Sequence, residues 1–133
     1  MNLKNYHTAI FLFSLLIICS FKTNPMKNED IVGVWVFSIY NDNYIEYTKK
    51  KSLYKNESGF VFKKNGRLIK RQNSSWCGTP PIEYKNYNGT WKYTSDSTIH
   101  INHKYWGGQA ESELLIIDLN QKSLRLKILS NKN

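Results

Sequence analysis

The sequence predicts an all-β fold, an antiparallel up-and-down meander of seven or eight strands that closes into a small barrel. Three observations predict this fold. After residue 30, apolar and polar residues alternate with a period of two, turn residues recur at short intervals, and no segment repeats apolar residues at helical spacing. A meander of this length is expected to close, because an open sheet would leave a long unpaired edge.

The first half of the domain contains the elements of four strands. Ile31–Tyr40 is rich in β-branched and aromatic residues and predicts a well-covered first strand, and residues 44–54 predict a weaker second one. Gly59–Phe62 and Arg67–Arg71 then form an expected hairpin. Asn65-Gly66 lies between them and predicts a two-residue primed turn, because both positions tolerate positive φ.

The second half begins with a connection and continues with further strands. Asn73–Pro81 is rich in Gly, Pro and Ser, and its two consecutive prolines lack the N–H groups that a strand interior needs. The strands expected after it are Tyr87–Tyr93, Thr98–Tyr105, Glu111–Leu119 and Leu124–Ile128, with turns at Ser95-Asp96, Gly107-Gly108 and Asn120–Lys122. The short connections are what indicate a meander.

The first 30 residues predict export. Lys4 precedes the apolar run Ala9–Ile18, which only Ser14 interrupts, and no acidic residue occurs in residues 1–8. A positive region followed by an apolar region is typical of a secretory signal. A membrane-spanning helix needs about 20 apolar residues, so we expect cleavage rather than anchoring by a helix.

Cys19 stands directly after Leu16-Ile17-Ile18 and before the polar segment 20–28. This arrangement resembles the lipobox of bacterial lipoproteins, in which the cysteine becomes the lipid-modified first residue of the mature chain. Ile18 departs from that pattern, which prefers a small residue there, and cleavage after Ser20 is the alternative. Either route leaves Cys77 without a partner for an internal disulfide.

The domain organisation follows from this resemblance. We expect a lipoprotein-type signal peptide over residues 1–18, a linker over 19–30 and the barrel domain over 31–130. A lipid on Cys19 would attach the protein to a membrane. The expected location is the outer membrane or periplasm of a Gram-negative bacterium, and secretion is the alternative.

Several motifs of the domain match one family. They are Gly33-Val34-Trp35, Gly59-Phe60-x-Phe62 with Asn65-Gly66, Trp76–Pro81, and Tyr87-x-Gly89-Thr90-Trp91. The first resembles the Gly-x-Trp signature of lipocalins, and together they resemble the lipocalin-like domain of small bacterial surface lipoproteins, over nearly the whole domain. The resemblance implies a lipocalin-like barrel with capacity for a ligand, and it implies no chemistry.

One family feature is missing from its expected place. Lipocalins carry an arginine near the last strand that packs on the tryptophan of the first strand, and Arg125 is the candidate by position. Alternation places Arg125 on the outer face, opposite to Leu124 and Leu126. This departure favours a distant relative of the same barrel type.

The candidate ligand site is an inward-facing aromatic surface with one polar group. Its residues are Trp35, Phe60, Phe62, Tyr87, Trp91, Tyr93 and Tyr105, with His103 among them. Binding sites for small molecules are mostly apolar and contain a few placed polar groups. The alternative is that the same side chains fill a solid core.

The residue pattern does not predict catalysis, a metal or a cofactor. His100 and His103 are three apart in one strand and therefore point to opposite faces, so they do not converge with Cys77 on a metal. No nucleophile-elbow or cysteine–histidine signature occurs. Glu111 and Glu113 share a face, which is interpreted as a polar edge.

Net charge bears on the partners. The formal charge is +9, and the basic residues are scattered apart from the short run Lys49–Lys51, so a nucleic-acid-binding tail is not expected. We expect a monomeric, non-enzymatic binding protein for a small apolar or amphiphilic ligand. The alternative is an envelope interaction module with a filled barrel, whose basic surface binds a protein or a polyanion.

Overall fold

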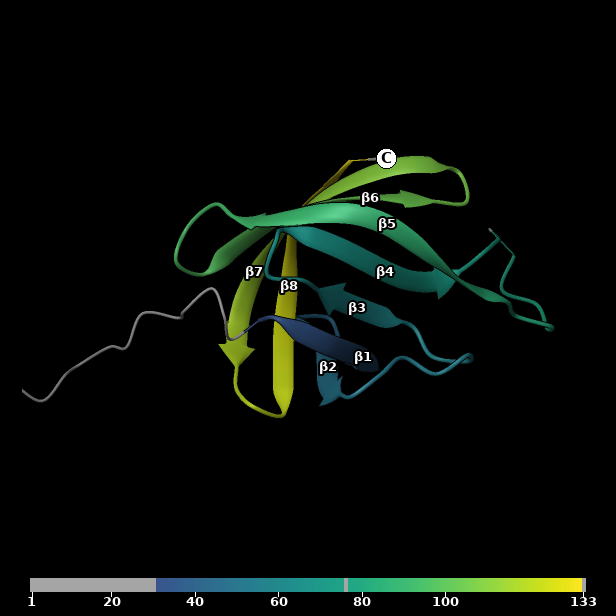
Figure 1. The fold of residues 1–133 in the computed structure, drawn as a ribbon, viewed down its shortest axis with the longest axis horizontal. Coiled ribbons are helices and arrows are strands. Elements are labelled where there is room, and N and C mark those ends of the chain that lie inside the picture. Colours follow the sequence, from purple (N-terminus) through teal and green to yellow (C-terminus); the bar gives the residue numbers. More distant parts are fainter. Residues whose placement is uncertain (1–30, 76, 133) are drawn as a thin grey trace, which may run out of the picture.

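The computed structural model describes residues 31–75 and 77–132, and these form one closed antiparallel barrel of eight strands (Figure 1). The strands are β1 (Gly33–Tyr40), β2 (Ile45–Lys50), β3 (Gly59–Phe62), β4 (Arg67–Asn73), β5 (Tyr84–Tyr93), β6 (Thr98–Tyr105), β7 (Gly108–Leu119) and β8 (Ser123–Lys132). The predicted all-β class and the closure are confirmed.

Some predictions fall on residues beyond this description. The predicted signal peptide, the predicted linker and Cys19, the predicted site of lipidation, lie outside the described residues, and so does Trp76. Within the part of the chain that is described, no helix is long and apolar enough to cross a membrane.

Neighbouring strands alternate up and down around the barrel, and one pair of strands departs from chain order. The spatial order is β2, β1, β3 and then β4 to β8, with β8 pairing back onto β2. Because β1 pairs antiparallel with both β2 and β3, those two strands run in the same direction. Residues 51–58 must therefore return along the barrel, and the N–H of Phe37 donates to Ser58 O at 2.9 Å where this segment reaches β3.

The hairpin between β3 and β4 forms, but its predicted turn type is wrong. Gly66 has a φ of +76°, whereas no residue other than glycine has a positive φ in the described chain, so Asn65 does not adopt the primed conformation. Instead, Asn65 Oδ1 accepts a hydrogen bond from the N–H of Arg67 at 3.2 Å. The N–H of Lys63 donates to Arg67 O at 3.0 Å, so the loop is wider than two residues.

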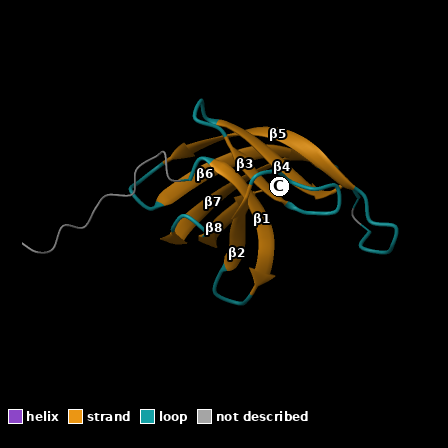
Figure 2. Cartoon of the chain, turned by 60° about the horizontal axis from the view of Figure 1, so that its bottom comes forward, coloured by secondary structure: helices purple, strands orange, loops and turns teal. Residues whose placement is uncertain are grey.

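Strand lengths differ from the predictions mainly at one end of the barrel. β5 begins at Tyr84 rather than Tyr87, and β8 continues to Lys132 rather than ending at Ile128. The added residues are mostly polar, but their backbones pair, as in the register partners Asn73↔Tyr84. Backbone pairing thus extends the strands beyond the alternating apolar residues from which they were predicted. Figure 2 shows these strands and their loops from a second direction.

We call the end of the barrel at which Trp35 and Trp91 lie the closed end, and both residues belong to the buried core cluster. Phe60, Phe62, Trp91 and Tyr93 form a chain of ring contacts with successive centroid distances of 5.4, 5.4 and 5.8 Å. Trp91 Nε1 donates to Lys63 O at 2.9 Å. The indole N–H therefore has a backbone partner at the end of β3, as buried polar groups require.

Trp35 seals the closed end. Its side chain is fully buried, and its Nε1 donates to Ile31 O at 2.7 Å. Lys49 Nζ lies over the indole, 4.9 Å from the ring centroid. A Cβ atom at Gly33 would stand 3.0 Å from Lys49 Cε, so the glycine of the Gly-x-Trp motif leaves room for the lysine stem.

Arg125 lies on the outer face, as alternation predicts, and does not pack on Trp35. Its Nε donates to Glu46 Oε2 at 2.8 Å, and its guanidinium lies 5.2 Å from the ring centroid of Tyr44. Glu46 and Arg125 are register partners on β2 and β8. A lysine from β2 thus occupies the place over Trp35 where the family resemblance led us to look for an arginine.

Candidate functional site

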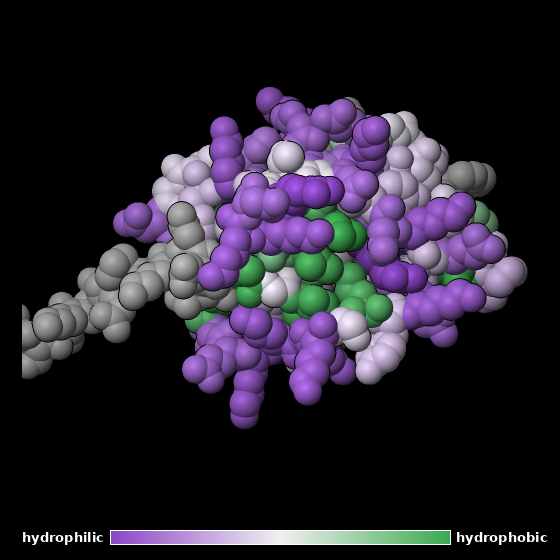
Figure 3. Space-filling model, in the orientation of Figure 1, coloured by the Kyte–Doolittle hydropathy of each residue, from purple (hydrophilic) through white to green (hydrophobic). Residues whose placement is uncertain are grey.

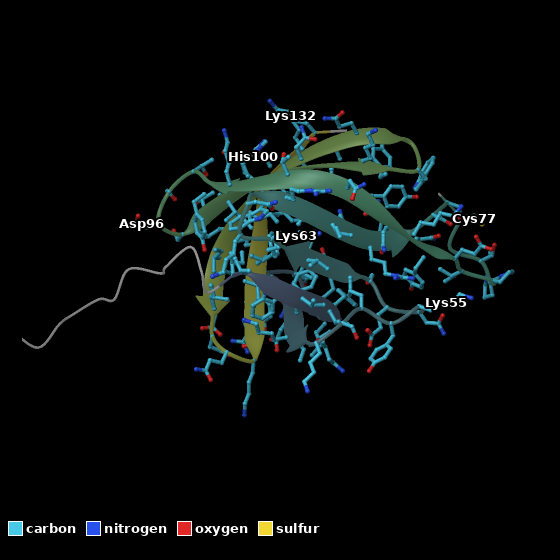
Figure 4. All side chains as sticks on the ribbon, in the orientation of Figure 1. Lys55, Lys63, Cys77, Asp96, His100 and Lys132 are labelled. Atoms are coloured by element: carbon cyan, nitrogen blue, oxygen red, sulfur yellow. The ribbon has the colours of Figure 1, made fainter. Side chains whose placement is uncertain are left out.

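An open pocket of about 130 Å³ lies at the opposite end of the barrel, which we call the mouth. Strands β1 to β4 and the segment before β3 form it. Its lining residues are Phe37, Tyr47, Ser58, Gly59, Phe60, Lys70, Arg71 and Gln72. The loops that carry Lys55 and Cys77 extend from one end of the molecule, and the turn that carries Asp96 lies at the other (Figure 4).

Three aromatic side chains make one wall of the pocket. Phe37 and Tyr47 are register partners on β1 and β2, so alternation brings both to the inner face. Their ring centroids are 6.2 Å apart, and Tyr47 and Phe60 are 5.2 Å apart. Burial raises the pKa of Tyr47, so the phenol stays neutral at physiological pH and keeps its O–H.

Lys70 faces this wall from β4. It shares the inner face with Leu68, two residues earlier, and its register partners are Phe60 on β3 and Tyr87 on β5. Its Nζ lies 5.7 Å from the ring centroid of Phe60 and 3.0 Å from His103 Nε2. Burial lowers the pKa of Lys70 to about 8, so the amine is still protonated at pH 7.

His103 is buried beside this amine, with 3% of its surface exposed. Its Nδ1 lies 2.9 Å from Lys104 O, and because a carbonyl oxygen only accepts, Nδ1 carries the proton. Nε2 is then the acceptor for Lys70. Burial and the charge of Lys70 lower the pKa of His103, so the pair holds one positive charge, on the lysine.

Gly89 allows a close approach of β5 and β6 beside His103. Gly89 lies on β5, between β4 and β6, and is the register partner of His103. A Cβ atom there would collide with Asn102 O and stand 2.8 Å from His103 Cβ. The missing side chain gives the backbone of β6 the room that it needs beside His103.

The pocket carries positive charge with no described counterion. Arg71 Nη2 donates to Lys55 O at 3.3 Å, whereas Arg71 Nε is buried without a hydrogen-bond partner. No acidic residue lines the pocket. Among the described residues, the ion pairs formed by side chains involve His100 with Glu111 and Arg125 with Glu46, and neither includes a cation of the pocket.

The predicted site residues lie in three places. Trp35, Phe62 and Trp91 belong to the packed core, and the partly buried Tyr93 packs against it. Phe60 lines the mouth pocket, His103 holds its lysine, and Tyr87 is the register partner of that lysine. Tyr105 packs edge-on against Trp106 with a centroid distance of 5.7 Å, at the turn between β6 and β7.

The sequence analysis missed the side of the pocket that bears charge. The missed lining residues are Phe37, Tyr47, Ser58, Gly59, Lys70, Arg71 and Gln72. The sequence does contain a signal for Lys70. This lysine lies two residues after Leu68 in the same strand, so the two side chains must share a face, and an inward Leu68 implies an inward Lys70. Lysine is usually solvent-exposed, which is why this signal was passed over.

Other polar groups lie apart from the mouth pocket. His100 Nε2 is 3.7 Å from Glu111 Oε2, and both residues line an outer depression of about 280 Å³ with Glu113. No group of three or more potential metal ligands occurs among residues 31–75 and 77–132. Cys77 is a free thiol whose Sγ lies 2.8 Å from Thr79 Oγ1, and this hydrogen bond lowers its pKa.

Comparison with known proteins adds no identification. No family model, no curated protein and no solved structure matches this chain. The class is therefore defined by the structure itself, as a closed eight-stranded antiparallel barrel with a cationic, aromatic-walled pocket at its mouth.

Proposed function

We propose that this protein is an exported, non-enzymatic, lipocalin-like binding protein that holds a small apolar or amphiphilic ligand at the barrel mouth. The observation that carries the proposal is the contrast between the two ends of the barrel. Trp35 and the core close one end, while an aromatic pocket opens at the other. Apolar walls with a few placed polar groups are typical of small-molecule sites.

The size of the pocket limits the ligand. A volume of about 130 Å³ is less than the ~300 Å³ at the lower end of pockets for drug-sized molecules. The pocket therefore suits a ligand of a few heavy atoms, or one end of a longer amphiphile. An apolar rim continues from the pocket along β1. It consists of Phe37, Ile39 and Tyr40, which are 43%, 57% and 66% exposed, and it could contact the part of a longer ligand that lies outside the pocket.

Binding without catalysis agrees with the charges that line the pocket. Its ionisable groups are Lys70, Arg71 and the neutral phenol of Tyr47, and no carboxylate accompanies them. A general acid–base pair needs two groups with separated roles at working pH. The charged groups of this pocket all favour holding a ligand.

A neutral, apolar fluorescent probe tests the proposal. We expect saturable binding to the full chain and displacement by unlabelled apolar compounds. Phe37→Ala should weaken binding because it removes part of the wall, and Ile117→Ala, which alters an exposed apolar side chain elsewhere, should not. Unsaturable binding, or equal affinity in both variants, would contradict the proposal.

The basic surface offers the competing hypothesis of an interaction module. Polar side chains cover most of the face in Figure 3, with apolar side chains gathered in its middle, and the formal charge is +9. If this hypothesis holds, the protein associates with a polyanion such as heparin, salt abolishes the association, and Phe37→Ala leaves it unchanged. That result without probe binding would replace the ligand proposal.

Attachment of the protein through a lipid on Cys19 is part of the same proposal. The sequence before the barrel supports it, because Cys19 follows the apolar run of the export signal. Mass spectrometry of the membrane fraction should detect an acylated N-terminal cysteine. Unchanged membrane retention of Cys19→Ala would contradict the lipid anchor and leave the ligand proposal in place.

A further inference from the structure

We propose that the mouth pocket binds the carboxylate of a small apolar acid, with the ammonium group of Lys70 as its counterion. This inference rests on the proposed function, because it names the chemical class of the ligand for the same pocket. It starts from an imbalance of charge: the lining includes the inward-facing ammonium group of Lys70 and no acidic residue.

The first step concerns the hydrogen bonds of Lys70. Its ammonium group has three N–H donors, and His103 Nε2, at 3.0 Å, accepts one of them. The partners found for this amine among the described residues are that neutral imidazole and the face of Phe60. A charge removed from water is costly unless an opposite charge and hydrogen bonds compensate, and an anion in the pocket would supply both.

The second step concerns the groups around the amine. His103 is held neutral, with its acceptor nitrogen turned toward Lys70, so it orients the ammonium without adding charge. Arg71 is the next residue on β4, so alternation turns it to the other face, and its Nη2 donates to Lys55 O. Gln72 and Tyr47 are neutral residues of the lining. Together these groups favour an anion over a neutral or cationic ligand.

The third step selects a carboxylate. One ammonium faces inward beside a neutral partner, which matches a single negative charge. Phe37, Tyr47 and Phe60 form a continuous aromatic wall on the same pocket, suited to an apolar group attached to the anion. A phosphate would bring a higher charge and no apolar part for that wall. The ligand class is therefore a monocarboxylate with a compact apolar body.

Calorimetric titration of the full chain at pH 7 tests this inference with three probes. Benzoate carries the carboxylate, benzyl alcohol is its neutral counterpart of similar size, and inorganic phosphate is an anion without an apolar body. We expect benzoate to bind more tightly than the other two. Tighter binding of phosphate, or equal binding of benzoate and benzyl alcohol, would overturn the inference.

Two lysine variants make the test specific to the pocket. Lys70→Met should weaken benzoate binding roughly ten- to a hundredfold, as expected for loss of a charged hydrogen bond, and leave benzyl alcohol unaffected. Lys49→Met is the matched control, since this lysine also lies over an aromatic ring but at the closed end. Equal benzoate affinity in both variants would exclude Lys70 as the counterion.

The outcomes separate this inference from the proposed function. If the neutral fluorescent probe binds in a saturable manner while benzoate does not depend on Lys70, the inference fails and the apolar site remains. If neither the probe nor benzoate binds, both are wrong. Circular dichroism of each variant establishes that the barrel is intact, and the wild-type comparison of the three probes stands without any variant.

Discussion

The two ends of the barrel each place a lysine over an aromatic ring, with different consequences. At the closed end, Lys49 Nζ lies 4.9 Å from the ring centroid of Trp35, and at the mouth Lys70 Nζ lies 5.7 Å from that of Phe60. Lys49 covers a filled core, whereas Lys70 borders a pocket and contacts a buried histidine. The same pair of residue types thus covers a packed core at one end and places a positive charge beside a pocket at the other.

Truncation of Trp35 should have the largest effect, because this side chain fills the closed end. Trp35→Ala is expected to lower the free energy of unfolding by about 3–5 kcal/mol, through lost burial and the cavity that remains. Urea denaturation measures this change. Trp106→Ala is the control, since Trp106 is 50% exposed. Comparable losses in the two variants would contradict the sealing role of Trp35.

A methyl group at Gly89 should have the next largest effect, and it acts beside His103. Gly89→Ala places a Cβ against the backbone of β6, at Asn102 and His103, and is expected to cost about 1–3 kcal/mol. Gly78→Ala is the matched control, because nothing lies within 4 Å of a Cβ there. Thermal denaturation with equal midpoints for both variants would contradict the close approach of β5 and β6.

Lys70→Met is expected to stabilise the protein, in contrast to the changes above. At pH 7 the wild-type chain buries a charged amine, and its pKa falls from an ordinary 10.5 to about 8 on folding. Removing this charge should raise the free energy of unfolding by about 1–3 kcal/mol. A lower stability of the variant at pH 7 would show that the amine is compensated in the wild type.

The difference in free energy of unfolding between Lys70→Met and the wild type should become smaller as the pH rises. Between pH 8 and 10.5 the unfolded wild type binds more protons than the folded one, so its stability rises with pH and approaches that of the variant. His103 is already neutral in this range, and Arg71 stays charged. The raised pKa of Tyr47 lowers stability above about pH 10 in both proteins and cancels in the difference. Urea denaturation at pH 7 and pH 9.5 measures the change, and a constant difference would contradict the burial of the Lys70 charge.

Alternation in the sequence was enough to predict the strands and the faces of their residues. Ile99, Ile101 and His103 were expected on one face, and all three are buried. A period of two arises from the geometry of a single strand, so it can be recognised in a sequence even when the neighbouring strands are unknown. For the same reason it could not show that β1 lies between β2 and β3, since the strand order depends on which edges pair.

The site was less predictable than the fold because it depends on register across several strands. Lys70 meets His103 across β5, so the contact depends on the register of β4, β5 and β6. The connection of residues 74–83 helps to set that alignment, and its composition indicates a loop without indicating a register. The aromatic residues were recognisable from the sequence, but their division between core and pocket was not.

The smallest predicted changes in stability concern Lys49 and Arg125, and they test which of these basic residues covers Trp35. Lys49→Met and Arg125→Ala should each cost less than about 1 kcal/mol, because cation–aromatic contacts and surface ion pairs are weak at exposed sites. Double-mutant cycles with Trp35→Phe separate them. Since Lys49 lies over the indole while Arg125 binds Glu46 on the outer face, the coupling energy should be measurable for Lys49 and near zero for Arg125. A larger coupling for Arg125 would instead assign the arginine to the closed end, and the contrast between the two lysines would no longer hold.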